Sequence, residues 1–454
     1  MKLLYLANGY PPRHTAGTEN YTAGIARAMA RAGHAVEVIC VGEWDTGPQA
    51  YNGIETAVHD GVTVHRLNIN WMRGPDPNRA LFDSPERETA VTRLVEALRP
   101  EVVHLTSATT LSASALRPVQ RGGYALVVTL TDFWFLCPQF TLRRSDGTLC
   151  DGQTTPWECL QCLLRPSGAY RWLRAVLPER ALEPGFAWAS RQPWLARQRG
   201  LRGMALDMAA RKRTLLPLLE AADAIIAPSR FLAEMFAANG LKKTVQVIPY
   251  GHDLEWARRV RPKPPGGPVV VGYAGRLTEA KGVHVLVEAA ARLEQDLPLE
   301  VHIYGDPNQE PAYGERLRDL ARNAPRVKFR GKFGRDELDE VLSALDVVAV
   351  PSLWYENNPL IAQEAFAAGR PVIASDLGGM AEFVEHEVSG WLFPPGDVEA
   401  LAGRLGALAL RPEQIEPMRG RLPRVRTTDE ERETLEALYE GLLRVRTPAR
   451  AGVP

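Results

Sequence analysis

Hydrophobic and polar positions alternate along the chain in blocks that predict strands followed by helices. Residues 2–7 are almost entirely apolar and predict a buried strand. An amphipathic stretch over 19–32, closed by Gly33, predicts a helix, and residues 35–41 predict the next strand. This alternation is typical of a parallel sheet with helices on both faces.

The same pattern continues to the end of the chain and predicts two α/β series. After His252, the sequence RVRPKPPGGP has the proline and glycine content of a linker. The last amphipathic stretch, 429–445, predicts a helix. Further strands are expected in the first series at 62–67, 102–105, 126–130, 224–227 and 245–249, and in the second series at 269–274, 300–304, 327–330, 347–350 and 371–374, with a short turn near Trp391.

Length and charge agree with a two-domain globular protein. A chain of 454 residues exceeds one ordinary core, so we expect domains of roughly 200 residues each. Lys and Arg total 54, as do Asp and Glu, which argues against a nucleic-acid binder that relies on overall charge. No apolar run reaches the roughly 18 to 20 residues of a membrane helix, and the first strand does not resemble a signal peptide. We therefore expect a cytoplasmic protein.

Two glutamates flank a predicted helix start in the segment PSLWYENNPLIAQEAFAAGRP. Pro359 suits the first turn of a helix, which places Glu356 in the preceding loop and Glu364 inside the helix. Free N–H groups around Asn358 to Ile361, that of Leu360 among them, would favour a phosphate. Glu364, further along, would accept hydroxyl hydrogens, as an acidic residue does for the ribose of a dinucleotide.

This segment, followed by AFAAGRPVIASDLGGMAEFV, resembles the signature of the family 4 retaining glycosyltransferases. The resemblance extends over nearly the whole chain, through PPRHTAGTENY, VIPYGHD, AGRLTEAKG and WLFPPGD. It implies a GT-B fold of two Rossmann-like domains that face each other across a cleft and bind a nucleotide-diphospho-sugar, with a C-terminal helix that returns to the N-terminal domain. The expected divisions are an N-terminal acceptor domain at 1–252, a linker at 253–267, a C-terminal donor domain at 268–427, and a helix and tail at 428–454.

Catalysis of sugar transfer requires stabilisation of the leaving pyrophosphate. Arg276 and Lys281 follow a predicted strand at the carboxyl edge of a sheet, and they are expected to contact the phosphates. The family places Glu356 against the sugar hydroxyls, beside Asn357 and Asn358. No acidic cluster typical of a magnesium site is present, and no second carboxylate is obviously placed for double displacement, so we expect metal-independent front-face transfer.

The N-terminal half supplies further candidates. By resemblance, the loop containing Gly17 and Thr18 reaches over the phosphates and the acceptor. In LTDFWFLCP, Asp132 is preceded by Thr131 where the family often has histidine. His104 and His14 are candidate substitutes, although a histidine at a strand end is also explained by a structural role.

An irregular stretch at 138–217 interrupts the N-terminal series. Within 165–213 there are eleven Lys or Arg against three Asp or Glu, together with Trp172, Trp188 and Trp194. One interpretation is a surface that contacts anionic lipid or a lipid-linked phosphate acceptor at the inner face of a membrane. The other is a helical excursion with a solvated basic face.

Four of the five cysteines fall close together around the start of this stretch. In a reducing compartment this clustering favours a structural zinc site over disulfides. Reduced thiols and a disulfide between neighbours remain alternatives. The candidate ligands are Cys137, Cys150, Cys159 and Cys162.

Other functions are also compatible with parts of the pattern. A nicotinamide oxidoreductase is disfavoured because no Gly-x-Gly-x-x-Gly follows the first strand. A non-catalytic sugar-nucleotide binding protein remains an alternative, motivated by Ala16 and Thr131, as does an epimerase or phosphorylase of the same fold. The resemblance favours a hexosyltransferase-type enzyme that transfers a sugar to an unknown hydroxyl acceptor in polysaccharide or glycoconjugate synthesis.

Overall fold

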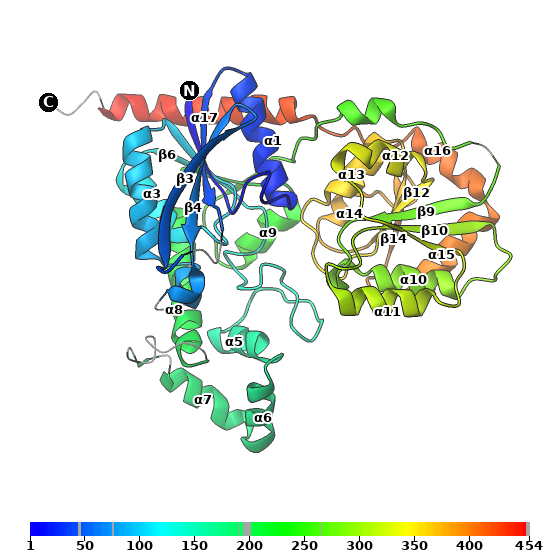
Figure 1. Cartoon of the computed structure of the whole chain (residues 1–454), viewed down its shortest axis with the longest axis horizontal. Helices are drawn as coiled ribbons and strands as arrows, with labels where there is room; N and C mark the ends of the chain where they lie inside the picture. Colours follow the sequence, from blue (N-terminus) through cyan, green and yellow to red (C-terminus); the bar gives the residue numbers. More distant parts are fainter. Residues whose placement is uncertain are drawn as a thin grey trace. The chain divides into compact units, whose positions relative to one another are not determined.

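A computed structural model describes residues 1–43, 47–74, 77–189, 191–192, 194, 201–264 and 266–450. The chain forms two compact units, unit 1 comprising Met1–Tyr250 with Thr428–Pro454, and unit 2 comprising Gly251–Thr427. Each unit is an α/β domain with a largely parallel sheet, so the expected pair of Rossmann-like domains is confirmed (Figure 1). Among the described residues, no helix combines the length and hydrophobicity needed to cross a bilayer.

Unit 1 contains an eight-stranded sheet with the order β3-β4-β2-β1-β5-β6-β7-β8. The expected strands are confirmed to within two residues. The sequence analysis missed β3, which pairs antiparallel to β4 at the sheet edge and is largely exposed, so it lacks the apolar run of a buried strand. The strands are β1 Lys2–Leu6, β2 Ala35–Val41, β3 Tyr51–His59, β4 Val62–Ile69, β5 Val102–Leu105, β6 Ala125–Thr129, β7 Ala224–Ala227 and β8 Val245–Val247.

Some helices of unit 1 begin at a residue whose side chain caps the first turn. Ser84 accepts a hydrogen bond from the Arg87 N–H, and Pro85 occupies the first turn of α3. The helices are α1 Gly17–Arg31, α2 Pro77–Ala80, α3 Pro85–Leu98, α4 Leu116–Arg121, α5 Pro156–Leu164, α6 Gly168–Val176, α7 Glu179–Ala189, α8 Leu201–Glu220, α9 Arg230–Ala238 and α17 Thr428–Arg450, with 3-10 turns η1 Trp71–Arg73 and η2 Ala113–Ala115.

The C-terminal helix α17 belongs to unit 1, as the family resemblance implied. It lies beside α1, and the two helices cover one face of the sheet (Figure 1). Leu435 and Tyr439 are fully buried there. The Tyr439 hydroxyl lies 2.6 Å from His104 Nδ1 and 3.3 Å from the Tyr5 hydroxyl, so the last helix is tied to β5 and β1 by polar contacts inside the core.

Unit 2 contains a six-stranded parallel sheet with the order β11-β10-β9-β12-β13-β14. All expected strands are confirmed, and the short turn near Trp391 is a strand. The elements are β9 Val269–Ala274, α10 Val283–Ala291, β10 Leu299–Tyr304, α11 Pro311–Ala321, β11 Val327–Gly331, α12 Leu338–Ser343, β12 Val347–Val350, α13 Leu360–Ala367, β13 Val372–Ser375, α14 Met380–Phe383, β14 Gly390–Phe393, α15 Val398–Leu410 and α16 Ile415–Arg419, with 3-10 turns η4 Glu255–Arg259, η5 Glu279–Lys281, η6 Arg335–Glu337 and η7 Pro412–Gln414.

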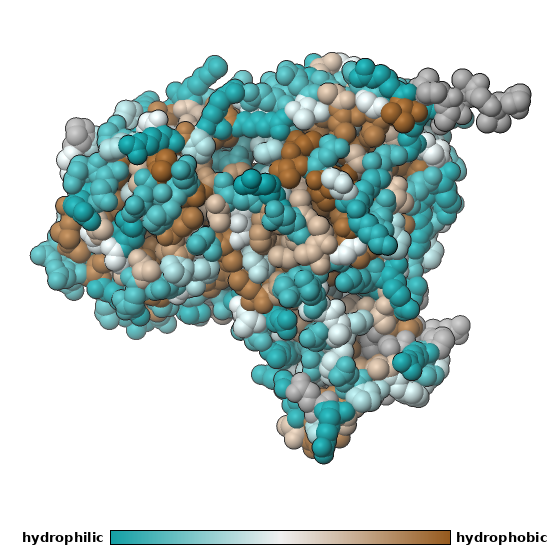
Figure 2. Space-filling view, turned by 180° about the vertical axis from the view of Figure 1, so that it is seen from behind, coloured by the Kyte–Doolittle hydropathy of each residue, from teal (hydrophilic) through white to brown (hydrophobic). Residues whose placement is uncertain are grey.

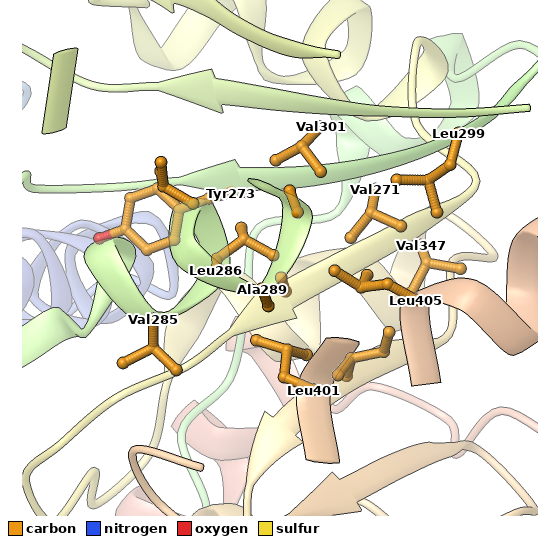
Figure 3. Close-up of a cluster of buried hydrophobic side chains, with 14 of the residues drawn as sticks. Val271, Tyr273, Val285, Leu286, Ala289, Leu299, Val301, Val347, Leu401 and Leu405 are labelled. Carbon is orange, nitrogen blue, oxygen red and sulfur yellow. The ribbon is translucent and has the colours of Figure 1, made fainter. Parts of the chain in front are cut away.

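Alternate side chains of the unit 2 strands enter two cores. Val271 and Val347 point to the core beneath α10 and α15 (Figure 3), whereas Val270 and Val348 point to the core beneath α12 and α13. This period of two on continuously apolar strands is the pattern of a sheet covered on both faces. Since helices cover both faces of the sheet, a ligand site is expected at the carboxyl ends of the strands.

The first part of the expected linker packs on unit 2. Trp256 in η4 is buried in the core beneath α12, and Arg259 forms an ion pair with Asp339 at 2.9 Å. The prolines and glycines that predicted a linker lie in the residues that follow η4. Pro265 lies outside the described residues, as do residues 451–454 of the expected tail.

Replacing Tyr439 with Phe should lower the free energy of unfolding by about 1–3 kcal/mol, because a core histidine nitrogen loses its partner. Urea denaturation of the variant and the wild type measures the difference. Glu440→Ala is the matched control, since its side chain is 59% exposed on the same helix, and it should change stability by less than about 0.5 kcal/mol. Equal effects of the two substitutions would contradict a structural role for the buried hydroxyl.

Candidate active site

The carboxyl edge of the unit 2 sheet brings the predicted donor residues together. From β9 the strand order runs outward through β10 to β11 on one side, and from β12 to β14 on the other. The loops after β9 and β12 therefore leave the sheet as neighbours at the point where the order reverses, which is where open α/β sheets bind ligands. Lys281 lies in the first loop and Glu356 in the second.

Close backbone contact holds these two loops against each other. The Leu353 N–H donates a hydrogen bond to the Ala280 carbonyl at 2.8 Å. Gly282 has a φ of +67°, and a Cβ at this position would lie 1.9 Å from the Pro351 carbonyl oxygen. Only glycine allows this approach, because any side chain would push the loops apart.

The loop after β13 closes the arrangement from the other side. The Gly379 N–H donates to the Glu356 carbonyl at 2.7 Å. A Cβ on Gly379 would lie 2.4 Å from the Asn357 carbonyl oxygen, so this loop also depends on a glycine. The loops after β9, β12 and β13 contact one another and thereby fix the backbone around Glu356.

Glu356 is a buried carboxylate held by three donors. Its Oε1 accepts hydrogen bonds from Lys281 Nζ, Ser352 Oγ and Trp354 Nε1, each at 2.7 Å. The Lys281 ammonium also lies 5.2 Å from the centre of the Trp354 ring. Burial alone raises the pKa of Glu356, but Lys281 and the hydrogen bonds outweigh it and hold the pKa below its usual value. The group is an anion at neutral pH.

Arg276, the other predicted phosphate contact, lies in the same loop as Lys281. The residue is exposed, and its carbonyl accepts the Tyr273 hydroxyl hydrogen at 2.6 Å, which fixes the loop backbone. Among the described residues, the Arg276 guanidinium has no ion-pair partner within 4.0 Å. It remains accessible beside the Lys281–Glu356 pair.

The helix expected after the asparagines begins one residue later than predicted. Leu360, half-buried, is the first residue of α13, and Pro359 is its N-cap. Asn357 and Asn358 lie in the loop just before this helix. The Asn358 side chain accepts a hydrogen bond from Gln363. The first N–H groups of the helix adjoin the loop that carries Glu356, as the sequence analysis expected.

Glu364 lies within α13 and is almost completely buried. Its Oε1 accepts a hydrogen bond from Arg335 of η6, whose side chain is 60% exposed. The sequence analysis did not identify Arg335, because its distance from Glu364 along the chain gives no sign of their contact. The Glu364 carboxylate is therefore buried, whereas Arg335, which contacts it, is open to solvent.

Unit 1 has a corresponding reversal of strand order between β1 and β5. The Thr110 N–H donates to Asn8 Oδ1 at 2.8 Å, which joins the loops after these two strands. Gly17 and Thr18 form the start of α1, as expected for their loop. Glu19 follows them, and it is buried with its Oε1 accepting a hydrogen bond from Asn8 Nδ2 at 3.2 Å.

Glu19 was missed as a site residue. In the sequence, Glu19 is only an acidic side chain in the first turn of a predicted helix. Such a residue is common there because it interacts favourably with the helix dipole, so it does not indicate a ligand. The structure adds a buried Oε2 with no hydrogen-bond partner among the described residues. Glu19 is also one of the charges that raise the pKa of Asp132.

Asp132 lies just beyond β6. Its Oδ1 accepts a hydrogen bond from the Trp134 N–H at 2.7 Å. Burial raises the pKa of Asp132 to about 6, and the Trp134 N–H and Arg211 offset only part of this effect. Thr131, where the family often has histidine, donates its hydroxyl hydrogen to the Thr106 carbonyl at 3.0 Å.

The two histidines considered as substitutes have other contacts. His104 is buried with Nδ1 on Tyr439 and Nε2 2.6 Å from Thr129 Oγ1, and burial lowers its pKa to about 3. His14 Nε2 lies 2.7 Å from the Gly42 carbonyl oxygen. Since both nitrogens of His104 are engaged inside the core, the geometry favours the structural role for that residue.

A cavity of about 350 Å³ near the end of β4 was not anticipated from the sequence. It is lined by an exposed Trp71, by Asn70, whose buried Oδ1 has no partner among the described residues, and by the buried Arg87. Such a lining can stack on a sugar ring and bond its hydroxyls.

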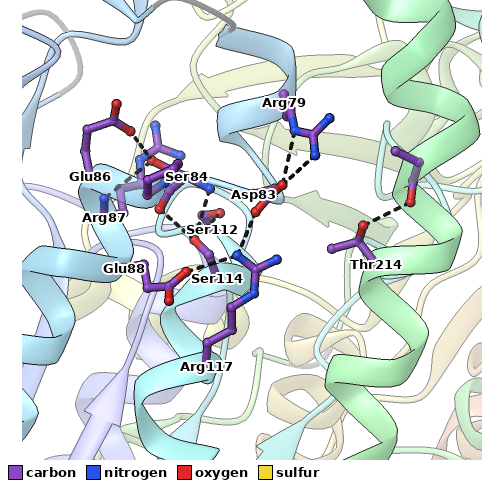
Figure 4. A network of polar contacts seen from close by, with 12 residues as sticks. Arg79, Asp83, Ser84, Glu86, Arg87, Glu88, Ser112, Ser114, Arg117 and Thr214 are labelled. Carbon is purple, nitrogen blue, oxygen red and sulfur yellow. Dashed lines mark hydrogen bonds and ion pairs between the residues drawn. The ribbon is translucent and has the colours of Figure 1, made fainter. Parts of the chain in front are cut away.

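A polar network borders this cavity (Figure 4). Asp83 accepts hydrogen bonds from Arg79 at 2.8 Å and from Arg117 at 2.7 Å, and Arg117 also contacts Glu88 at 3.0 Å. Burial alone raises the pKa of Asp83, but the two guanidinium groups outweigh it and lower the pKa. The network ties α2, α3 and α4 together around the cavity.

Comparison with known proteins identifies both halves of the chain. A model described as glycosyl transferase 4-like domain matches residues 16–251, and one described as glycosyl transferases group 1 matches residues 268–410. The D-inositol 3-phosphate glycosyltransferase of Rhodococcus erythropolis is 29% identical over 316 residues, covering 59% of this chain and 71% of that protein.

Other curated relatives match over shorter stretches. The D-inositol 3-phosphate glycosyltransferase of Corynebacterium urealyticum is 38% identical over 146 residues, covering 31% of this chain and 34% of that protein. The amylovoran biosynthesis glycosyltransferase AmsK of Erwinia amylovora is 33% identical over 159 residues, covering 33% and 38%. The chain thus spans little more than a third of the length of such relatives.

Solved structures share the fold over the whole chain. HepE of Anabaena, crystallised with UDP and glucose, has a TM-score of 0.58 at 17% identity, with 100% of both chains covered. The sucrose-phosphate synthase of Thermosynechococcus elongatus has a TM-score of 0.58 at 20% identity, covering 99% of this chain and 98% of that one. Because the two family models account for both Rossmann-like units, the chain belongs to the group 1 family of glycosyltransferases, with the GT-B fold.

Proposed function

We propose that this protein is a metal-independent retaining glycosyltransferase that moves a sugar from a nucleotide-diphospho-sugar to a hydroxyl acceptor. The observation that carries the proposal is the buried Lys281–Glu356 pair at the point where the unit 2 strand order reverses. Lys281 and Arg276 lie in one loop, and Lys281 contacts Glu356 in the loop that precedes the first N–H groups of α13. These positive groups would bind the pyrophosphate and stabilise the charge that it gains as the glycosidic bond breaks.

Glu356 is assigned to positioning rather than to nucleophilic attack. A carboxylate whose Oε1 already accepts three hydrogen bonds is a weak nucleophile, but it is well placed to keep Lys281 oriented and to accept a sugar hydroxyl on its other oxygen. In front-face transfer, the acceptor oxygen attacks the anomeric carbon on the side of the leaving phosphate, which takes the acceptor proton. Glu364 would bind the nucleoside hydroxyls.

The contact with the nucleotide can be tested by titrating the protein with UDP, GDP, ADP and dTDP in a calorimeter, with and without a chelator of free divalent cations. One nucleoside diphosphate should bind preferentially, and the chelator should not change its affinity. Arg276→Ala, Lys281→Ala and Glu364→Ala should each weaken binding by roughly 10- to 100-fold. Lys328→Ala, which changes an exposed lysine near the amino end of β11, is the control. Unchanged affinity in all three variants would mean that the donor does not bind here.

Loss of the Lys281–Glu356 pair should also affect stability, and this effect can be separated from binding. Lys281→Ala leaves a buried carboxylate unpaired and should cost about 3–5 kcal/mol of unfolding free energy. Adding Glu356→Gln removes that charge and should restore part of the loss, although nucleotide binding stays weak. Denaturation of the two single variants and the double variant measures the coupling. Additive losses would show that the two charges do not stabilise each other.

The insertion of unit 1 suits peripheral contact with an anionic membrane surface, where a lipid-linked acceptor would be found. Trp172 in α6 is 69% exposed and Trp188 in α7 is 58% exposed, and Arg171 lies beside Trp172 on the chain. Figure 2 shows hydrophobic and hydrophilic residues interspersed over this part of the surface. Exposed tryptophans with neighbouring arginines are typical of side chains that enter the interface of a charged bilayer.

Co-sedimentation with vesicles tests the membrane contact. Binding should be stronger to vesicles containing phosphatidylglycerol than to phosphatidylcholine alone, and it should weaken at high salt. Trp172→Ala combined with Arg171→Glu should reduce the bound fraction several-fold, whereas Trp71→Ala, which removes an exposed tryptophan outside the insertion, should not. Equal recovery of wild type and double variant would favour the solvated basic face.

A further inference from the structure

We propose that Cys137, Cys150, Cys159 and Cys162 bind one zinc ion, which holds the start of the unit 1 insertion in place. The four residues come from three segments, with Cys137 in the loop after β6, Cys150 after a short hairpin, and Cys159 and Cys162 on α5, yet all four line one cavity. Its volume is about 30 Å³, which is the size of a single small ligand. The family comparisons assign no role to this cavity, and the proposal does not depend on the sugar-transfer activity.

Local structure explains how the cysteines come together. The chain between the first two forms a hairpin, in which Arg143 pairs with Leu149 and the Cys150 N–H donates to the Leu142 carbonyl at 2.7 Å. The last two lie three residues apart on α5 and therefore share one face of that helix. The N-terminus of α5 is fixed by a capping box from Thr155.

Backbone N–H groups point at the sulfur atoms. The Ser145 N–H donates to Cys162 Sγ at 3.4 Å, and the Gly152 N–H donates to Cys150 Sγ at the same distance. Gly152 has a φ of +78°, and a Cβ there would lie 2.7 Å from the Asn239 side chain, so the turn that presents this donor requires glycine. Amide donors to sulfur orient metal-bound thiolates and disperse their charge.

A buried cation lies beside the cluster. Arg211 of α8 is 6% exposed, interacts electrostatically with Cys137 and Cys159, and lies 5.0 Å from the centre of the Trp134 ring. Zinc with four thiolates carries a net charge of −2, and a buried arginine compensates part of that charge. Arg211 also interacts with Asp132, so the cysteine cluster is connected to the loop at the end of β6.

The insertion has little hydrophobic core of its own. In the part of the insertion that the structure describes, its hydrophobic cluster has four buried residues, Leu160, Leu164, Tyr170 and Met208. Small substructures with so little buried apolar surface commonly depend on a metal or on cross-links. A zinc ion that joins α5 to the hairpin and to the β6 loop would supply that constraint.

Metal binding requires a rearrangement of side chains. Among the described residues, no three Cys, His, Asp or Glu side chains already surround a common point, and the cysteines are free thiols. Rotation of the thiols about their side-chain bonds into the shared cavity would bring the sulfurs around one ion. Zinc then forms four Zn–S bonds as the four S–H protons leave to solvent, with no redox change.

Metal analysis of the untagged, full-length protein tests the proposal directly. After gel filtration with a mild chelator, the wild type should retain close to one zinc per chain. Replacement with cobalt should give the thiolate-to-cobalt charge-transfer absorption of a tetrahedral sulfur site. Both measurements use the wild type, so they do not depend on whether a variant folds.

Substitutions then identify the ligands. Cys159→Ser should weaken metal affinity at least about tenfold and lower the thermal midpoint, whereas Cys40→Ser, which removes a cysteine buried in β2, should retain the full metal content. A wild type that carries no zinc and has all five thiols reactive after denaturation would overturn the proposal. Disulfides among these cysteines, found by mass spectrometry of protein purified without oxygen, would overturn it as well.

Discussion

The ion pair between Lys281 and Glu356 is the interaction on which the candidate site of unit 2 depends. A carboxylate that is 6% exposed remains charged only because an ammonium and two neutral donors surround it. The pair forms only where the loops after β9 and β12 touch, and this contact in turn requires Gly282. The ion pair therefore depends on the strand order, which makes the two loops neighbours, and on Gly282, which lets them touch.

Unit 1 uses buried polar contacts in a different way. His104 is neutral in the core and joins β5 to the C-terminal helix through Tyr439, so the end of the chain stabilises the first domain. Asp132, nearby in sequence to the cysteine insertion, is influenced by both Glu19 and Arg211. Arg211 lies over the ring of Trp134, whose N–H donates to Asp132, so contacts run from α8 to the carboxyl end of β6.

The sequence predicted most of the fold because the parallel strands are buried on both faces and read as short apolar runs. Strand β3 escaped this signal, since an exposed antiparallel edge strand has no such run. For the candidate site, Arg276, Lys281, Glu356 and Glu364 were predicted from their positions next to strand and helix ends together with the family resemblance, and they stay predictions. Arg335 was not found, because only the packing of η6 against α13 brings it to Glu364.

The sequence by itself determined the α/β pattern, the helix start to within one residue of Pro359 and the residue types available for binding phosphate, because these depend on local preferences and on spacing along the chain. Only the tertiary structure decided that Lys281 neutralises Glu356, that His104 is occupied in the core, and that four cysteines from separate elements line one cavity. The contacts of Lys281 and His104 join residues that are distant in sequence, and the cysteines come together through the folding of three segments. Their geometry is set by strand order and packing, which no local pattern encodes.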